Sequence, residues 1–407
     1  MAKHGLVLAG GGARGAYEVG VLHYLLAESE PELRKRAHFK VYAGTSVGAL
    51  NVTALAAWAH DLEQGSHALV QRWKNLSLDL LVPLSFSDVM SLPGWLAGRN
   101  RREALFPGSP LKTVINSSVP WNNIRTNIES GLIDAISVTC TQVSTGNTVV
   151  FYEEKELVQR PWSRDPHVRA VPTYIGQSHA RASAAIPLIF PPVEVEGALY
   201  VDGGLRQNTP LSPALRLGAE SVLVIGVGHA RDRRRHQDFA DREAAVGKPF
   251  YLLGKVLDAL MIDRIDYDLI RLSHFNRLLL DGQEAFGETF GDRLNAISAR
   301  TRHANYRVVP NLYFKPSRDI GQLAAQFIRQ GKFISERSLT ARVIRTISRS
   351  ESNDEADLAS YILFDGGFAS QLIELGMEDA YQRREALLEF FARSEEGIHA
   401  ASESSRF

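Results

Sequence analysis

The chain has 407 residues, of which 44% are hydrophobic and 23% charged, a composition typical of a globular protein and not of a disordered or fibrous one. Lysine plus arginine and aspartate plus glutamate both number 46, so the chain lacks the basic surplus typical of nucleic-acid binding, and we expect no nucleic-acid partner. A single cysteine excludes an intrachain disulfide framework and favours a reducing cytoplasm.

The N-terminus and the apolar runs bear on targeting. Met1-Ala2-Lys3-His4 leads directly into a strand-like run, without the apolar core and cleavage site of a signal peptide. No apolar run approaches the ~20 residues that a transmembrane helix requires. We therefore expect a cytoplasmic protein, while export by a route without such a signal stays open.

A glycine-rich loop follows the first expected strand. Residues 4–9 have the composition of a buried strand, and Gly10-Gly11-Gly12-Ala13-Arg14-Gly15 precede an amphipathic helical stretch at 16–28. Such a loop is an anion-binding arrangement, because backbone N–H groups point at the ligand. The same letters fit a dinucleotide-binding loop, but the second strand, at 39–43, is not followed by the acidic residue that would hold a ribose. A turn that only joins strand to helix is the remaining alternative.

In an acyl-transfer enzyme this loop would supply the oxyanion hole. Its glycines let a substrate carbonyl approach the backbone N–H groups, and Gly11 and Gly12 are the best donors, beside Gly10. Arg14 has two open interpretations: it adds positive charge near the substrate, or it holds the loop.

The stretch from Val41 to Asn51 has the pattern of a nucleophile elbow. A short apolar strand leads to Ser46, which is flanked two residues away on each side by Gly44 and Gly48, and a helix of small apolar residues begins directly after it. In such an elbow the serine lies on a strained turn, and glycines avoid the side-chain collisions. The positive end of the following helix points at the serine hydroxyl.

An irregular stretch follows a helical pattern at 61–81. Residues 82–110 combine four prolines with large apolar side chains and with Arg99, Arg101 and Arg102. Apolar side chains beside basic ones can meet lipid head groups, so 83–107 is a candidate peripheral membrane contact. A loop packed on the core is the alternative.

The second conspicuous motif follows a pair of expected hairpins. The first hairpin joins 132–143 to 148–152, residues 153–177 are polar and helical or irregular, and a helix of small residues at 178–186 ends at Pro187. The second hairpin, 193–195 with 199–201, leads into Asp202-Gly203-Gly204. An aspartate at a strand end lies at the sheet edge where α/β proteins build their sites.

A nucleophilic serine needs a base within hydrogen-bonding distance. Histidine is the usual base, and the chain order serine, aspartate, histidine would favour His229 over His179, His274 and His303, which have ordinary helix or loop contexts. None has a context as suggestive as that of Asp202. A carboxylate can act directly if burial raises its pKa above the ordinary ~3.9.

The order of strands and helices predicts an α/β fold with a mostly parallel sheet and helices on both faces. The later expected elements are a buried strand at 221–228, a helix at 249–280, a strand at 306–314, a helix at 317–333, and a helical stretch at 354–391 that is interrupted near Gly366-Gly367. We expect a catalytic domain at 1–316, a helical C-terminal extension packed on it at 317–393, and a disordered tail at 394–407. Asp365-Gly366-Gly367, a second Asp-Gly-Gly, falls inside a helical pattern and is not expected to be catalytic.

Together these motifs resemble the patatin-like phospholipase family. The resemblance covers residues 4–228 and also includes Ala184-Ala185-Ile186-Pro187. It implies a serine–aspartate acyl hydrolase of phospholipase A or lysophospholipase type, which acts on phospholipids or related acyl esters without a metal or another cofactor. By motif position Ser46 is the nucleophile, Asp202 the base, and Gly10, Gly11 and Gly12 the oxyanion loop. The accompanying motif glycines are Gly15, Gly44, Gly48, Gly203 and Gly204.

Two alternatives remain at this stage. One is an esterase or thioesterase for soluble acyl groups, and the other is a non-catalytic module that binds lipid or nucleotide. The sequence predicts no oligomeric state.

Overall fold

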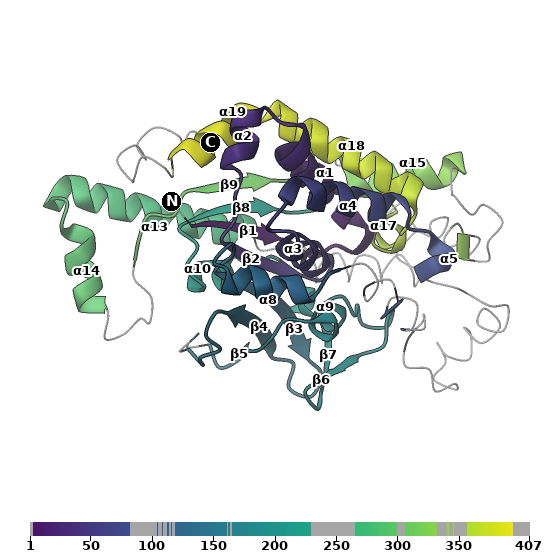
Figure 1. Cartoon of the computed structure of the whole chain (residues 1–407), viewed down its shortest axis with the longest axis horizontal. Helices are drawn as coiled ribbons and strands as arrows, with labels where there is room; N and C mark the ends of the chain where they lie inside the picture. The colour runs from purple at the N-terminus through teal and green to yellow at the C-terminus, as the bar shows by residue number, and fades with distance from the viewer. Residues whose placement is uncertain are drawn as a thin grey trace, which may run out of the picture.

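The computed structural model describes residues 3–81, 119–160, 165–228, 265–298, 306–331 and 356–393, together with residues 104, 108, 112, 113, 115, 162, 340, 341 and 345. Within these residues a central sheet is packed between helices (Figure 1). The expected tail, nearly all of the candidate membrane contact at 83–107, and His229 and His303 lie outside the described residues.

The described strands form one mixed sheet of nine strands. They are β1 His4–Leu8, β2 Val41–Thr45, β3 Ala135–Gln142, β4 Thr148–Glu154, β5 Val168–Pro172, β6 Val193–Val195, β7 Ala198–Asp202, β8 Ser221–Ile225 and β9 Asn311–Phe314. The order is β5-β4-β3-β2-β1-β8-β9, and β7 joins the hairpin β6–β7 to β3. Five pairs are parallel and only the pairs of β3 with β4, β3 with β7 and β6 with β7 are antiparallel, so the mostly parallel sheet is confirmed.

The described helices cover both faces of this sheet, as the sequence predicts. They are α1 Ala16–His23, α2 Pro31–Arg36, α3 Val47–Ala57, α4 Leu62–Lys74, α5 Leu78–Leu81, α8 Asn122–Glu129, α9 Gln177–Ser183, α10 Leu211–Arg216, α13 Ile265–Phe286, α14 Phe290–Ser298, α15 Ile320–Gln330, α17 Asp357–Ile362, α18 Gly366–Gln382 and α19 Arg384–Arg393. Short 3-10 segments lie at Gly12–Gly15 and Gly203–Leu205, and α1 continues as a π-helical turn over Tyr24–Glu28.

Alternate residues of the strands point into two hydrophobic cores. Leu6 and Leu8 of β1 pack in the larger core with α1, α3, α4 and the C-terminal helices, whereas Val7 packs in a smaller core with α10 and the start of α13. This alternation follows from the two-residue period of a strand, and burial on both faces explains why the central strands are nearly continuous apolar runs.

Several expected elements differ in extent or type from the structure. The stretch 153–177 contains the strand β5, which was missed because its five residues carry only a weak alternation at the edge of the sheet. The helix expected at 178–186 ends at Ser183, and the strand expected at 306–314 pairs only over β9. The helical stretch expected at 354–391 is interrupted before Gly366, as expected, where Asp365 caps the start of α18, and it comprises α17, α18 and α19.

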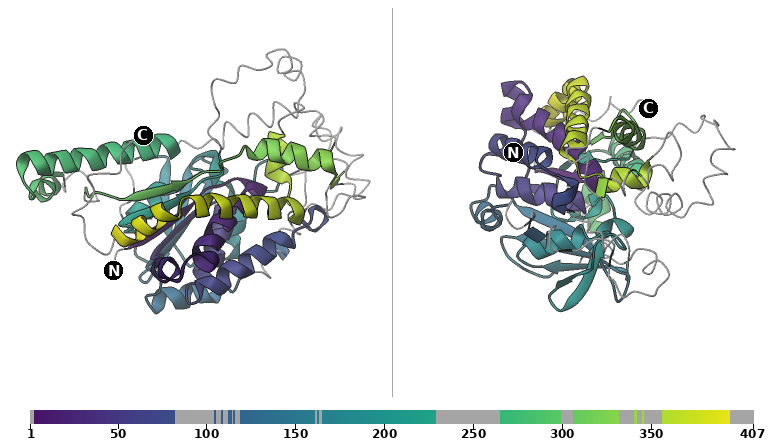
Figure 2. Two further views of the ribbon diagram at one scale, coloured as in Figure 1. Left: turned by 90° about the horizontal axis from the view of Figure 1, so that it is seen from above. Right: turned by 90° about the vertical axis from the view of Figure 1, so that its right-hand side faces the viewer.

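The C-terminal helices pack on the first βα unit of the chain. α18 lies against α1, at the top of Figure 1, and Figure 2 shows the same contact from two other directions. Two glycines permit this close crossing: a Cβ on Gly20 would lie 2.1 Å from the Ile373 carbonyl oxygen, and one on Gly376 would lie 2.3 Å from that of Tyr17. The helical C-terminal extension is therefore present and in direct contact with α1.

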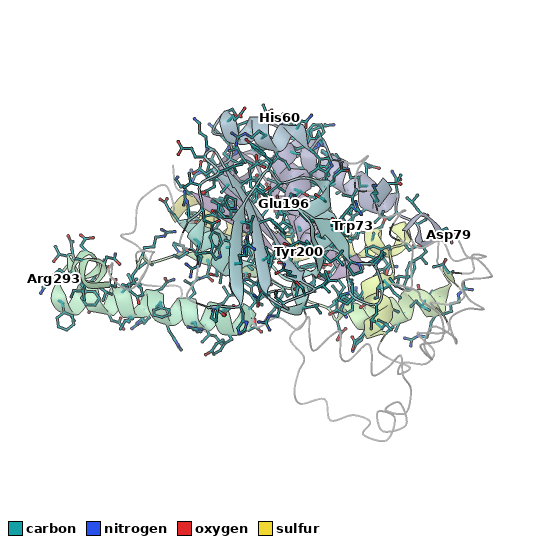
Figure 3. The ribbon with its side chains drawn as sticks, turned by 90° about the horizontal axis from the view of Figure 1, so that it is seen from below. His60, Trp73, Asp79, Glu196, Tyr200 and Arg293 are labelled. Carbon is teal, nitrogen blue, oxygen red and sulfur yellow. The ribbon has the colours of Figure 1, made fainter. Side chains whose placement is uncertain are left out.

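The helices α13 and α14 extend beyond the end of the sheet. Arg293 on α14 and Asp79 in α5 lie on opposite sides of the described part of the chain (Figure 3). None of the described helices combines the length with the apolar composition that a bilayer span requires.

Candidate active site

Ser46 occupies the tight turn between β2 and α3. Its backbone has φ 55° and ψ −127°, a conformation that residues with a side chain rarely adopt. Such strain persists only where the surrounding structure enforces it, and it places the serine side chain at the strand-to-helix corner. The geometry is that of the predicted nucleophile elbow.

The glycines around this turn are required by close backbone contacts. A Cβ on Gly44 would lie 2.5 Å from the Gly48 carbonyl oxygen, and one on Gly48 would lie 2.4 Å from that of Leu8. Gly15 is similarly restricted, because its Cβ would lie 2.6 Å from the side chain of Val47. These three motif glycines let the glycine loop, the elbow and α3 pack together.

Ser46 and Asp202 form a buried hydrogen-bonded pair. The Ser46 hydroxyl donates to Oδ2 of Asp202 at 2.5 Å, and the two residues are 1% and 0% exposed. The other carboxylate oxygen, Oδ1, accepts from the backbone N–H of Gly204 at 2.7 Å. A Cβ on Gly203 would lie 2.2 Å from the Thr139 carbonyl oxygen, so the Asp-Gly-Gly turn fits closely against β3.

Strand pairing along β3 brings these two residues together. β2 pairs with β3 up to Thr45 opposite Thr139, and β7 begins its pairing with Asp202 opposite Cys140. Because β4 occupies the other edge of β3 over this region, β7 takes over the edge that β2 leaves at the elbow. Ser46, which follows Thr45, and Asp202 therefore lie beside neighbouring residues of β3.

Burial changes the acidity of Asp202. Loss of hydration raises the pKa of this carboxyl group from 3.8 to about 7, against the opposing effect of the hydrogen bonds from Ser46 and Gly204. A carboxyl group with a pKa near neutrality is a stronger base than an exposed aspartate.

The glycine loop lies directly beside Ser46. A Cβ on Gly10 would lie 2.9 Å from Cβ of Ser46. The N–H of Gly10 donates to the Asn208 carbonyl oxygen at 3.1 Å, and the side-chain amide of Asn208 donates to the Gly10 carbonyl at 3.0 Å. In the described part of the chain, the N–H groups of Gly11 and Gly12 have no protein acceptor, so both remain for a ligand.

The Arg14 side chain extends to α17. Its Nε donates to Oγ of Ser360 at 2.8 Å, Nη2 lies 3.5 Å from a carboxylate oxygen of Asp357, and the guanidinium carbon lies 4.0 Å from the centre of the Tyr361 ring. The residue is 6% exposed. Of the two interpretations of Arg14, these contacts favour the one in which it holds the loop.

Sequence analysis missed Ser183, the last residue of α9. Its hydroxyl accepts from the backbone N–H of Ser46 at 2.8 Å and donates to the Thr139 carbonyl oxygen at 2.6 Å. It thus connects the elbow to β3. The only available signal was its position directly before the Ala184-Ala185-Ile186-Pro187 motif, in a helix where many residues are small.

A second group of buried side chains forms hydrogen bonds next to the elbow, between α3 and its neighbouring helices. The Asn51 amide donates to Oε2 of Glu18 at 2.8 Å and to the Gly15 carbonyl at 3.3 Å, and Asn51 Oδ1 accepts from the indole of Trp73 at 3.2 Å (Figure 3 labels Trp73). Burial raises the pKa of Glu18 well above its ordinary value. This network joins α1, α3 and α4 to the end of the glycine loop.

The rival residues have other roles in the structure. Asp365 caps α18, because its carboxylate accepts from the backbone N–H groups of Gly367 and Phe368. The Nδ1 atom of His179 accepts from the Gly176 N–H at 3.1 Å, and His274 lies exposed on α13. Among the described residues, no group of three or more His, Cys, Asp or Glu side chains is arranged to hold a metal ion.

The fold and this site define an α/β protein with a nucleophile elbow and a buried serine–aspartate pair. The family model described as patatin-like phospholipase matches residues 6–215, which is more than half of the chain. The chain belongs to the patatin-like phospholipase family.

The curated relatives are distant and much longer. Lysophospholipase NTE1 of Phaeosphaeria nodorum is 25% identical over 246 residues, which are 58% of this chain and 13% of that protein. Patatin-like phospholipase domain-containing protein ZK370.4 of Caenorhabditis elegans is 27% identical over 246 residues, which are 58% of this chain and 14% of that protein. The chain thus spans a small part of the length of these relatives.

Among solved structures, human GIVD cytosolic phospholipase A2 in complex with methyl gamma-linolenyl fluorophosphonate is similar to this chain with a TM-score of 0.41 and 13% identity. The alignment covers 97% of this chain and 59% of that chain.

Proposed function

We propose that this protein is a lipid acyl hydrolase that cleaves acyl ester bonds of phospholipids or lysophospholipids, with Ser46 as nucleophile and Asp202 as base. The observation that carries the proposal is the 2.5 Å hydrogen bond between the Ser46 hydroxyl and the Asp202 carboxylate in a setting removed from water. Membership of the patatin-like phospholipase family supports the reaction class, and relatives named lysophospholipase support the substrate class.

The first half of the reaction forms an acyl-enzyme. Asp202 Oδ2 accepts the Ser46 hydroxyl proton while Oγ bonds to the ester carbonyl carbon. The carbonyl oxygen becomes an oxyanion, which the N–H groups of Gly11 and Gly12 stabilise. The intermediate then collapses, the bond to the leaving alcohol breaks, and Asp202 gives its proton to that alcohol's oxygen.

The second half releases the fatty acid. A water molecule loses a proton to Asp202 as its oxygen bonds to the acyl carbon, and a second oxyanion forms in the same hole. Collapse of this intermediate breaks the bond to Ser46 Oγ, which regains its proton from Asp202. The enzyme returns to its starting state and no cofactor takes part.

The raised pKa of Asp202 suits this role. Only the ionised carboxylate accepts a proton, and a base with a pKa of about 7 accepts one more readily than an ordinary aspartate while it is still partly ionised at neutral pH. Burial therefore gives Asp202 the near-neutral pKa that a histidine base has in the more usual triad.

Covalent labelling with a fluorescent fluorophosphonate tests the nucleophile and the base. We expect the wild type to label, Ser46→Ala to lose labelling entirely, and Asp202→Asn to label far more slowly. Asp365→Asn is the matched control, because asparagine also caps helices and α18 should persist. Full labelling of a folded Ser46→Ala variant would remove Ser46 from the mechanism.

A second measurement addresses the substrate. Hydrolysis of a lysophospholipid should be lost in Ser46→Ala, and the rate per enzyme should rise once the substrate forms micelles if the protein acts on lipid aggregates. Equal rates with a short soluble ester and no gain on micelles would favour the esterase or thioesterase alternative. A membrane contact at 83–107 predicts that the rate per enzyme rises once the substrate forms micelles.

A further inference from the structure

We propose that α17, in the C-terminal extension, sets the position of the oxyanion loop, and that Arg14 is the positioning residue through which it acts. We call the contacts of Arg14 with Asp357, Ser360 and Tyr361 the α17 clamp. The inference rests on the proposed function, because it assigns a role to the loop in stabilising the oxyanion.

The polar contacts of the clamp fix the Arg14 side chain in direction and distance. The bond from Nε to Ser360 Oγ is 2.8 Å long, and the Ser360 hydroxyl in turn donates to the Asp357 carbonyl oxygen at 2.6 Å. Asp357 lies 3.5 Å from Nη2 and is buried like Arg14, at side-chain exposures of 6% and 7%. A buried guanidinium needs such partners, and the loss of one is costly where no water replaces it.

The backbone of α17 also touches the loop directly. Gly12, at φ 56°, faces the Tyr361 carbonyl oxygen so closely that a Cβ would lie 2.2 Å from it. Arg14 reaches the same helix from two residues further on. The N–H donors of Gly11 and Gly12 therefore lie in a segment that is held from the C-terminal side of the chain.

The next turn of the chain is held by α18 in the same way. The Tyr17 hydroxyl donates to Oδ2 of Asp379 at 2.9 Å, and Gly20 and Gly376 allow α1 and α18 to cross at backbone contact. The helix α1 begins directly after the glycine loop. The contacts of α17 with the loop and of α18 with α1 therefore together determine where the loop ends and α1 begins.

The contacts with α17 already engage Nε and Nη2 of Arg14. The Asp357 carboxylate opposes the charge of the guanidinium, whose carbon lies 4.0 Å from the centre of the Tyr361 ring. The clamp predicts that changes in α17 and changes in Arg14 have the same consequence, whereas a substrate contact predicts that they are independent.

Steady-state kinetics on a lysophospholipid separate these predictions. We expect Ser360→Ala and Arg14→Lys each to lower kcat by about tenfold to a hundredfold, because displaced oxyanion donors lose part of an effect that reaches about 10²- to 10³-fold per donor. KM should change by less than about twofold, because the oxyanion exists only in the transition state. The double variant should be no slower than the slower single variant, because both changes break one interaction.

Ser370→Ala is the matched control. Ser370 donates to the Gly366 carbonyl within α18, as Ser360 donates to the Asp357 carbonyl within α17, but in the described part of the chain it makes no hydrogen bond to the glycine loop. We expect wild-type kcat. The clamp would be contradicted if the reductions in kcat caused by Arg14→Lys and Ser360→Ala multiplied in the double variant. A wild-type kcat for Ser360→Ala would contradict it too.

Hydrogen exchange gives a readout that does not depend on activity. In Ser360→Ala and Arg14→Lys, amides of a peptide covering 10–16 should exchange faster than in the wild type and in Ser370→Ala, while the peptide of β8 stays unchanged. Unchanged exchange at 10–16 would contradict the clamp even if the protein hydrolyses no lipid. A wild type that neither labels nor hydrolyses lipid would instead contradict the proposed function.

Discussion

At the scale of single residues, the site depends on groups held in unfavourable states. Ser46 has a strained backbone, and burial disfavours ionisation of the Asp202 carboxyl group. Glycines whose Cβ atoms would collide with backbone make the first state possible, and the hydrogen bonds from Ser46 and Gly204 moderate the second. Functional groups commonly carry such a cost in stability.

The stability of Asp202→Asn relative to wild type should therefore increase as pH rises. The folded pKa of about 7 exceeds the ordinary 3.8, so the favourable contribution of the protonated carboxyl group is complete below about pH 4 and is lost as pH rises through 7. Asparagine does not ionise. We expect the melting temperature of the variant relative to wild type to increase from about pH 4 to about pH 7 and then to level off.

Thermal unfolding followed by circular dichroism measures this difference. Asp61→Asn, which replaces an exposed helix-capping carboxylate on α4, is the control for the general effect of removing a carboxylate. A difference that shrinks as pH rises would show that Asp202 is not held with a raised pKa.

At the scale of elements, β3 organises the site. β2 and β7 use successive parts of one edge of β3, and Ser183 at the end of α9 bonds both to β3 and to the elbow. Each of these elements is short. Their alignment depends on contacts between segments that are far apart in sequence.

Ser183→Ala should impair catalysis and stability together. The variant leaves the N–H of Ser46 without its partner at the strained turn, and a buried unpaired donor costs about 1–3 kcal/mol. We expect a melting temperature several degrees lower and a reduced kcat. Ser137→Ala is the matched control, because Ser137 is also a fully buried serine, on β3, but its hydroxyl has no hydrogen-bond partner among the described residues. Equal effects of the two substitutions would contradict this role of Ser183.

The elements around Ser46 and Asp202 could be predicted because their signals are local. The Gly44 and Gly48 pattern and the Asp202-Gly203-Gly204 turn each lie within one stretch, and the hairpins and small-residue helices that flank them are confirmed. Contacts between distant segments carry no such signal. Three features depend on the complete fold. They are the hydrogen bond between Ser183 and Ser46, the pairing of first β2 and then β7 with one edge of β3, and the contacts of Arg14 with α17.

At the scale of the whole molecule, the C-terminal extension is integrated with the N-terminal part of the chain. Phe368 and Leu372 of α18 are fully buried in the larger core. On α19, the Phe391 ring lies 4.8 Å from that of His4, at the start of β1. We propose that the expected regions 1–316 and 317–393 form one folding unit.

A chain that ends at residue 316 should consequently fail to fold. It loses the side chains that cover α1 and the start of β1, and we expect weak helical circular dichroism and no cooperative thermal unfolding. The matched control ends at residue 393 and should unfold like the full chain. A fragment 1–316 that unfolds cooperatively and labels with fluorophosphonate would show that the extension is dispensable.

The distance along the chain between the partners of the α17 clamp has a consequence for synthesis. Arg14 and Ser360 are separated by 346 positions, and Ser46 and Asp202 by 156. At about 5–20 residues per second, roughly 15–65 s pass between translation of the serine and that of the clamp. On the proposed mechanism, a growing chain therefore carries Ser46 long before Asp202 and the partners of Arg14 have been made, and we expect no lipid hydrolysis before α17 has been synthesised.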